Sequence, residues 1–223
     1  MTADPSPPTF AATDLACLRG GRMVFDGLGF AIEAGDALAL TGANGSGKSS
    51  LLRLLAGLSR PFAGTLSWRG RPISEDSDAH RARIAYVGHA DGVKAGLTAF
   101  ETLSFWAALH EPREAAARAE RALEDFDLSP LRDVLGRYLS SGQKRRLGLA
   151  RLLASPGALW LLDEPTVGLD AASVSRLEVM VARHRDRGGI VVLATHMPVA
   201  LPGALNIDLD AFSVDPASSW GTE

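Results

Sequence analysis

The sequence predicts a single α/β domain that has an antiparallel β portion near its N-terminus and a helical segment inserted into its core. Three observations predict this class. Short apolar runs, such as residues 158–162 and 190–194, have the length and composition of strands buried in a parallel sheet. A glycine-rich loop joins another apolar run, Ala37–Thr41, to a helical pattern. From residue 92 to about 155 the strand signals stop and helical patterns follow one another, which indicates the insertion.

The composition is that of an ordinary globular protein, with 46% hydrophobic and 22% charged residues. The formal net charge of -3 gives no overall basic field, so nucleic acid is not an expected partner, although a local patch would suffice. A single cysteine, Cys17, excludes an internal disulfide and favours a reducing compartment. No apolar run reaches the roughly 20 residues that a membrane-spanning helix needs, so at a membrane a partner would supply the spans.

The first half of the chain alternates strands and turns. We expect residues 1–13 to form a flexible leader, since residues 1–9 are polar and proline-rich and do not resemble a secretory signal. Two strands near residues 14–18 and 23–33 are joined by a tight turn at Gly20 and Gly21. The elements expected next are a strand at 37–41, a helix at 48–58, and strands at 65–68 and 84–87.

The second half contains the helical insertion and the return to the sheet. Helices are expected at residues 97–109, 113–126, 130–138 and 142–154, then strands at 159–162 and 190–195 on either side of a helix at 171–186. The predicted division is one domain over 14–213, with its helical part at about 92–155, and a loose polar tail over 214–223.

Residues 42–49 match the phosphate-loop pattern G-x-x-x-x-G-K-[ST] in full, with a strand before them and a helix after them. Glycines let backbone N–H groups turn toward phosphate oxygens, and the helix N-terminus adds partial positive charge. Lys48 is expected to reach the β- and γ-phosphates, and the Ser49 hydroxyl to hold Mg²⁺. The candidate nucleotide-binding residues here are Gly42, Ala43, Asn44, Gly45, Ser46, Gly47, Lys48, Ser49 and Ser50.

The apolar run 159–162 leads directly into two acids, Asp163 and Glu164. Two carboxylates at the tip of a buried strand are costly unless they serve a cation, and open α/β sheets bind ligands at the carboxyl ends of their strands. We expect Asp163 to position Mg²⁺, through water, and Glu164 to act as the general base on the attacking water.

Between these two motifs lies Leu139-Ser140-Ser141-Gly142-Gln143, followed by Lys144-Arg145-Arg146. This stretch resembles the L-S-G-G-Q signature of the ABC ATPase family, with Ser141 where a glycine is usual. The resemblance covers nearly all of residues 14–212 in the family's order. It implies a P-loop NTPase core of the ABC ATPase type, with ATP and Mg²⁺ as cofactors and ATP hydrolysis as the activity.

The resemblance also implies roles for several residues. The signature, with Ser140, Gly142 and Gln143, would close over the ATP of a second copy of the chain, so that two copies sandwich two ATP molecules. His196, after the strand at 190–195, would contact the γ-phosphate. Asp170 matches the family's dimer-contacting loop, in which Val167 replaces a common serine.

Two positions depart from the family's pattern. His89 follows Gly88 where a glutamine is expected, and it either binds metal-associated water or is a surface-loop histidine. No aromatic residue precedes the phosphate loop to stack on adenine, and Arg19 is the candidate for that role because its planar guanidinium can stack.

Within the family, Tyr86-Val87-Gly88-His89 and Gly92-Val93-Lys94 resemble the ATP-binding subunits of the haem exporter of bacterial cytochrome c maturation. That resemblance implies a peripheral subunit on the cytoplasmic face of the bacterial inner membrane, bound to an integral membrane subunit. Another short ABC exporter subunit, or a soluble non-transport ABC ATPase, is the alternative.

No direct haem site is visible in the sequence, and His80, His110 and His184 are expected at the surface. The helical segment 92–155 is the expected docking face for the membrane partner. For Phe105 and Trp106 we expect core packing, and the alternative is that one of them meets the partner.

Overall fold

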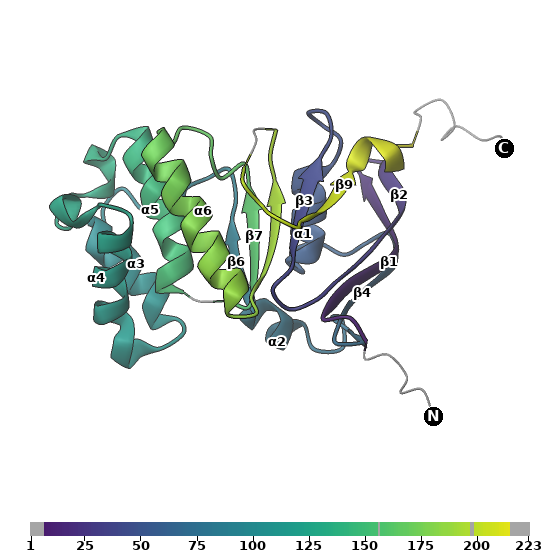
Figure 1. Cartoon of the computed structure of the whole chain (residues 1–223), viewed down its shortest axis with the longest axis horizontal. Coiled ribbons are helices and arrows are strands. Elements are labelled where there is room, and N and C mark those ends of the chain that lie inside the picture. The colour runs from purple at the N-terminus through teal and green to yellow at the C-terminus, as the bar shows by residue number, and fades with distance from the viewer. Residues whose placement is uncertain (1–6, 156, 197–198, 215–223) are drawn as a thin grey trace.

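Two sheets of different kinds lie side by side in the computed structural model, which describes residues 7–155, 157–196 and 199–214 (Figure 1). The antiparallel sheet has the order β2-β1-β4-β5 and the parallel sheet the order β6-β7-β8-β3-β9. The strands are β1 (Phe10–Arg19), β2 (Arg22–Ile32), β3 (Ala37–Thr41), β4 (Ala63–Trp68), β5 (Arg71–Pro72), β6 (Ile84–Val87), β7 (Leu159–Asp163), β8 (Ile190–Ala194) and β9 (Leu205–Asp208).

The helices divide between the sheets and a helical lobe at the end of the molecule that lies away from the antiparallel sheet (Figure 1). They are α1 (Lys48–Leu55), α2 (Ser77–Ala82), α3 (Ala99–Ala108), α4 (Ala115–Asp125), α5 (Ser141–Ala154) and α6 (Ala171–Asp186). The helices α3, α4 and α5 all fall between β6 and β7 in the chain, which is the inserted helical segment. The predicted fold class is therefore confirmed.

The parallel sheet is buried on both faces, and β7 shows why its sequence is continuously apolar. Trp160 and Leu162 belong to the core that the sheet forms with the helical segment and α6. Leu159 and Leu161 belong to the core that it forms with α1 and the antiparallel sheet. Since side chains alternate between the faces of a strand, both sets must be apolar. This sandwiching fixes the carboxyl end of β7, where Asp163 and Glu164 follow.

The first strand begins earlier than expected. β1 starts at Phe10, which is fully buried and packs against Phe30 and Trp68, within the segment expected to be a leader. Residues 1–6 of that leader and residues 215–223 of the expected tail lie outside the described residues.

The helix expected at residues 130–138 is wrong. Two short 3-10 turns, Ser129–Leu131 and Gly136–Tyr138, stand there instead. The backbone between them bonds to the segment before α3: Ala99 N–H donates to the Val134 carbonyl (3.1 Å), and Gly136 N–H donates to the Leu97 carbonyl (2.8 Å). These long-range bonds use the groups that a continuous helix would have paired internally.

Three side-chain expectations also fail. His80 is buried, 1% exposed, and its Nε2 lies 2.8 Å from the Leu55 carbonyl oxygen. His184 is half-buried and stacks on Trp160, whereas His110 is exposed as expected. Phe105 is 54% exposed and therefore not a core residue, while Trp106 is partly covered by the Arg151 guanidinium, 4.0 Å from its ring centroid.

Candidate nucleotide site

The phosphate loop joins β3 to α1, and neighbouring side chains leave no room for a Cβ at its last glycine. Gly47 has φ 107°, and a Cβ there would lie 2.6 Å from Val24 Cγ1. The Lys48 side chain, on an almost buried residue, folds back over the loop, and its Nζ donates to the carbonyl oxygens of Gly42 (2.6 Å) and Ala43 (3.0 Å). The ammonium group is thus already held over the mouth of the loop.

Three side chains from three elements meet beside the loop. His89 Nε2, just after β6, lies 3.3 Å from Ser49 Oγ in α1 and 3.3 Å from Asp163 Oδ2 at the end of β7. Asp163 is 2% exposed, so its carboxylate faces the site rather than bulk water. No group of three His, Cys, Asp or Glu side chains able to hold a metal ion occurs among the described residues. One hydroxyl and one carboxylate, together with phosphate oxygens, are a set of oxygen ligands that suits Mg²⁺.

Glu164 and His196 form a pair across the carboxyl ends of β7 and β8. Glu164 Oε2 lies 2.9 Å from His196 Nδ1 and accepts a hydrogen bond from the His196 backbone N–H (3.3 Å). Glu164 has a positive φ of 48°, and its own N–H donates to the Ala194 carbonyl (2.8 Å). A non-glycine residue in this conformation is uncommon and marks functional sites when the surroundings hold it in place.

Arg145 is a site residue to which the sequence analysis gave no role. It is buried, and its guanidinium donates to the carbonyl oxygens of Asp163 (3.0 Å) and Glu164 (2.5 Å). It also donates to the Gly88 carbonyl (2.9 Å) and pairs with Asp91 (3.3 Å). The guanidinium therefore ties the acidic turn after β7 to the loop that carries His89. The signal in the sequence was its place among the basic residues after the signature.

Asp210 is a second residue of the site that no pattern in the sequence points to. It lies in the 3-10 turn Leu209–Phe212 after β9, and its Oδ2 accepts a hydrogen bond from the Ala43 N–H (2.9 Å). The Asp210 N–H in turn donates to Asp208 Oδ1 (3.1 Å). Because β9 pairs with β3, this turn lies directly behind the start of the phosphate loop. No motif precedes or includes Asp210, so the sequence alone carried no signal for it.

A cavity of about 320 Å³ collects many of the predicted residues. It is lined by Arg19, Val24, Asn44, Gly45, Gly47, Lys48, Ser49, Ser50, His89, Asp163 and Glu164. Arg19, the candidate for stacking on adenine, lies on its wall. His196 lines an adjoining cavity together with Thr41 and Gly42.

Tyr86 lies in β6, close to the site. Burial raises the pKa of the Tyr86 phenol, and the negative charge of Asp163 raises it further. The phenol therefore remains protonated at physiological pH. It adds bulk rather than charge behind Asp163.

The signature residues do not line this cavity. Ser140 caps α5, with its Oγ accepting from the Gln143 N–H (3.2 Å) and its N–H donating to Gln143 Oε1 (2.8 Å). Ser140 is exposed, and a Cβ added at Gly142 would lie 3.3 Å from the Gly168 carbonyl, next to the loop that ends at Asp170. Asp170 itself caps α6 through the Ser173 N–H (2.8 Å). The capped N-terminus of α5 is thus exposed and lies outside the cavity that the phosphate loop of the same chain lines.

Comparison with known proteins gives consistent results. The family model described as ABC transporter matches residues 25–167, more than half of the chain. The chain is 56% identical over 211 residues to the cytochrome c biogenesis ATP-binding export protein CcmA of Paramagnetospirillum magneticum, covering 94% of this chain and 97% of the relative. It is 43% identical over 188 residues to the protein of the same name from Escherichia coli K12, covering 84% of this chain and 89% of the relative.

Solved structures agree in fold. The ATP-binding subunit of an ABC transporter superposes with a TM-score of 0.77 at 25% identity, over 85% of this chain and 80% of that one. The ATP-binding cassette MJ0796, a dimer bound to ADP and Pi after hydrolysis, superposes with a TM-score of 0.73 at 23% identity, over 84% of this chain and 88% of that one.

Proposed function

The chain belongs to the ABC transporter ATP-binding family, and from that premise we propose which of its residues bind and hydrolyse ATP and what the hydrolysis drives. The chain matches cytochrome c biogenesis ATP-binding export proteins over nearly the full length of those relatives. The chain is accordingly the ATP-binding and hydrolysing subunit of an export complex in cytochrome c biogenesis. The observation that carries the residue assignment is the meeting of the phosphate loop, Asp163 and the Glu164–His196 pair at one edge of the parallel sheet.

ATP binds with its phosphates in the loop 42–49. The Lys48 ammonium exchanges the Gly42 and Ala43 carbonyl oxygens for the β- and γ-phosphates, and the N-terminus of α1 contributes N–H donors. Arg19 stacks on the adenine from the far wall of the cavity.

Ser49 and Asp163 would hold Mg²⁺, Asp163 through water. When bound, the ion neutralises charge on the phosphate oxygens as the γ-phosphoryl group is transferred. His89, 3.3 Å from both residues, is placed to bind a water of the metal's hydration shell, which is the role of the glutamine that it replaces. Whether Nε2 donates or accepts in that hydrogen bond depends on the tautomer of the ring.

Hydrolysis needs a base at the γ-phosphate, and Glu164 supplies it. The water oxygen bonds to the γ-phosphorus while Glu164 accepts the water's proton. The bond from the γ-phosphorus to the bridging oxygen breaks, and ADP leaves with that electron pair. His196 orients Glu164 through Nδ1, and its Nε2 contacts the γ-phosphate.

Two copies of the chain complete two sites. Ser140, Gly142 and Gln143 of one copy meet the γ-phosphate held by the other, since they are exposed or half-exposed at the N-terminus of α5 and lie outside the chain's own cavity. Asp170, at the start of α6 beside them, belongs to the same interface. ATP favours the closed dimer because it supplies the bridging charge, and hydrolysis reopens it.

No helix in the described part of the chain is long and apolar enough to cross a membrane. We place the chain as a peripheral subunit on the cytoplasmic face of the bacterial inner membrane, bound to an integral membrane subunit. The side chain that argues for the docking surface is Phe105 on α3, 54% exposed, with Leu109 one turn further along at 62%. We propose that the complex moves haem, or releases a haem-carrying chaperone, on the far side of the membrane.

The test of the catalytic assignment is Glu164→Gln. We expect ATP affinity to stay within about threefold of the parent, turnover to fall by at least about 100-fold, and ATP to trap a stable dimer. Steady-state hydrolysis, nucleotide titration and light scattering with ATP measure the three effects. Glu124→Gln on the exposed face of α4 is the matched control and should behave like the parent. Parental turnover in Glu164→Gln contradicts the assignment.

The test of the biological assignment is affinity isolation of the chain from bacterial membranes. An integral membrane protein of cytochrome c biogenesis should accompany it, and Phe105→Asp should release that protein while ATP binding is retained. Recovery of an unrelated permease, or a soluble chain whose hydrolysis responds to DNA or ribosomes, contradicts the assignment.

A further inference from the structure

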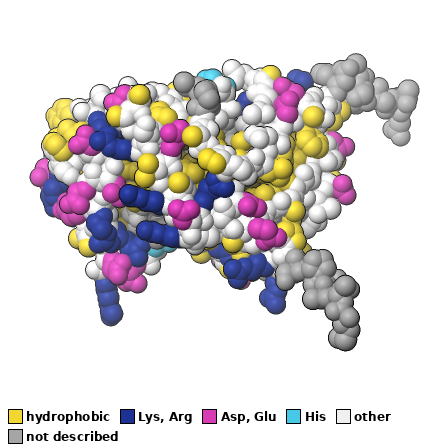
Figure 2. Space-filling view, in the orientation of Figure 1, with side chains coloured by type: hydrophobic (Ala, Val, Ile, Leu, Met, Phe, Trp, Pro, Cys, Tyr) yellow, Lys and Arg dark blue, Asp and Glu magenta, His cyan; other side chains and the backbone are white. Residues whose placement is uncertain are grey.

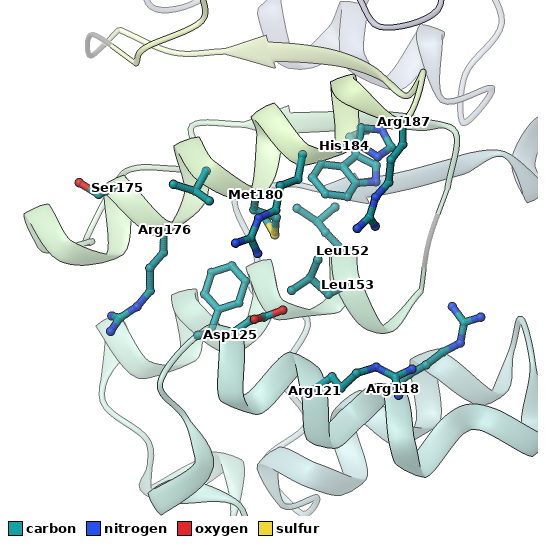
Figure 3. A pocket seen from close by; sticks show the side chains of 14 residues that line it. Arg118, Arg121, Asp125, Leu152, Leu153, Ser175, Arg176, Met180, His184 and Arg187 are labelled. Atoms are coloured by element: carbon teal, nitrogen blue, oxygen red, sulfur yellow. The ribbon is translucent and has the colours of Figure 1, made fainter.

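A second large groove lies away from the nucleotide site, and the proposed ATP cycle gives it no role. It has a volume of about 760 Å³ and lies between α4 and α6, over the C-terminal part of α5 (Figure 3). Trp160, at the start of β7, lines it, whereas Asp163, at the other end of the same strand, belongs to the nucleotide site. The two sites therefore share the strand β7 and have no lining residue in common.

The floor of the groove is apolar and uncharged. Phe126, Leu152 and Trp160 are buried beneath it, and Val179 is 50% exposed on its wall. His184 stacks on Trp160, with ring centroids 3.8 Å apart and planes 7° apart. Desolvation by burial lowers the pKa of His184 to about 4, so the imidazole is neutral at physiological pH and contributes a flat surface instead of a charge.

The rim is strongly basic, although the whole chain has a formal net charge of -3. Five arginines and a single acid, Asp125, line the groove. The arginines are Arg118, Arg121, Arg176, Arg183 and Arg187. Figure 3 shows Arg118 and Arg121 on the α4 side, and Arg176 and Arg187 on the α6 side. Figure 2 shows Lys and Arg side chains on the left half of the view, with Asp, Glu and apolar side chains among them.

The chain neutralises only part of this positive charge. Arg118 pairs with Glu114 (2.9 Å), and Arg176 lies 3.6 Å from Asp127. Arg121, Arg183 and Arg187 form no ion pair with an acid among the residues that the structure describes. Like charges collected around an apolar floor repel one another, and an anionic ligand would remove that repulsion.

The spacing of the arginines indicates an elongated ligand. Arg176 and Arg187 are eleven positions apart on and just after α6, which corresponds to about 16 Å along a helix. A single phosphate or carboxylate would contact one end of this row and leave the rest unpaired. A nucleic acid also carries its charge along its length, but proteins that bind single strands stack the bases on aromatic side chains. The aromatic side chains Trp160 and Phe126 of this groove are buried.

We propose that this groove binds an acidic amphipathic helix of a protein partner. The apolar face of that helix packs on Val179 and Leu153, and its carboxylates meet the arginines of α4 and α6 along both edges. About 12 residues of helix span the row of arginines on α6. The mode is that of an amphipathic helix laid in a groove between two helices, with charge complementarity fixing its direction.

The probe is a fluorescent 14-residue peptide of Glu, Leu and Ala with leucines on one helical face and glutamates beside them. We expect it to bind the full chain and to bind about tenfold more weakly in 300 mM than in 50 mM salt, as fluorescence anisotropy would show. A peptide with glutamine in place of every glutamate should bind at least about tenfold more weakly.

The variants Arg183→Glu and Arg187→Glu should each lower the affinity for the glutamate peptide by about tenfold or more. Both side chains are exposed and form no ion pair with described residues, so the fold should be retained, as a thermal melt would verify. Arg60→Glu, exposed and outside the groove, is the matched control and should change the affinity by less than about twofold. Basal ATP hydrolysis should be unchanged in all three.

Several outcomes overturn the proposal. If the glutamate and glutamine peptides bind equally well, charge attraction does not hold the peptide in the groove. Equal effects of Arg60→Glu and Arg183→Glu place the peptide elsewhere. If single-stranded oligonucleotide or laurate binds in the groove and the glutamate peptide does not, the occupant is a different class of molecule.

Discussion

At the scale of single residues, Asp210 shows how the nucleotide site is held from behind. Its carboxylate accepts a hydrogen bond from the Ala43 N–H (2.9 Å), and a Cβ on Gly42 would lie 3.3 Å from Asp210 Oδ1 and 2.9 Å from Ser46 Oγ. The turn after β9 therefore holds the first residues of the phosphate loop. We infer that Asp210 is a positioning residue, since it contacts the loop and does not line the cavity.

We expect Asp210→Ala to raise the KM for ATP by about three- to tenfold and to change kcat by less than about twofold, because one hydrogen bond that pre-forms the loop is lost. Asp210→Asn keeps an acceptor oxygen and should recover most of the affinity. Steady-state kinetics and nucleotide titration separate the two constants. An unchanged KM in Asp210→Ala, or an Asp210→Asn variant as impaired as Asp210→Ala, would show that the contact is not needed.

Arg145 is the other residue that holds the site from outside it. Its buried guanidinium donates to four backbone carbonyls, those of Gly88, Asp163, Glu164 and Pro165, with the planar fork that a lysine lacks. Arg145→Lys should therefore reduce kcat by at least about tenfold and lower the melting temperature by several degrees. Arg146→Lys, next in the chain and half-exposed, is the matched control. Parental kinetics in Arg145→Lys would exclude a positioning role for the guanidinium.

These residues show which parts of a site the sequence can reveal. The phosphate loop and the acids after β7 are local patterns whose chemistry depends on neighbours in the chain, so Lys48, Asp163 and Glu164 could be selected in advance. Asp210 and Arg145 act through backbone carbonyls and N–H groups of distant segments, and such partners carry no signal in the sequence. His89 lies between these cases: its position was visible, but its distance of 3.3 Å to both Ser49 and Asp163 required the structure.

At the scale of elements, the sequence was most informative for the buried strands. β3 and β6 lie where their apolar runs predicted, because a strand buried on both faces is apolar along its length. Residues 130–138 could not be predicted in this way. Their backbone pairs with residues 97–99, and a Cβ on Gly136 would lie 2.4 Å from the Lys94 carbonyl oxygen, so a close contact between segments decides their conformation.

The contact of α6 with β7 gives a pH-dependent stability. Burial lowers the pKa of His184 to about 4 from an ordinary 6.5. Above pH 6.5 the ring is neutral in both states and no penalty arises. As the pH falls toward 4, the unfolded chain takes up a proton that the folded chain excludes, so the free energy of unfolding decreases. Below pH 4 the loss no longer grows.

His184→Phe keeps a ring to stack on Trp160 and removes the titration. We expect its free energy of unfolding to fall less than that of the parent between pH 7 and pH 5, by about 1 kcal/mol, an amount reduced for the partial solvent exposure of the ring. Denaturant unfolding at the two pH values measures the difference. His110→Phe, whose histidine is exposed, is the control. Identical pH dependence in parent and His184→Phe would mean that the stacked histidine titrates as a free one.

At the scale of the whole molecule, the proposed function gives one chain two halves of different sites. The phosphate loop, Asp163 and Glu164 line one cavity, while Ser140 is exposed at the capped start of α5 and lies outside it. Under the proposed function, such a chain gains its full set of γ-phosphate donors only when a second copy supplies them. The helical segment that contains α5 sits beside the sheet in Figure 1, so a change at the nucleotide could be transmitted to α3, where Phe105 and Leu109 are exposed.

Mixing two inactive variants tests this arrangement. Lys48→Ala removes the phosphate loop's cation, and Ser140→Arg blocks the signature, so each variant alone should hydrolyse ATP at less than about 5% of the parental rate. In an equal mixture, half of the dimers are hybrids, and each hybrid pairs the intact loop of one chain with the intact signature of the other. Since such a dimer has one working site of two, we expect about a quarter of the parental rate. A mixture no more active than its components would mean that the signature serves the ATP of its own chain, because only a site shared between two chains can be rebuilt by exchanging partners.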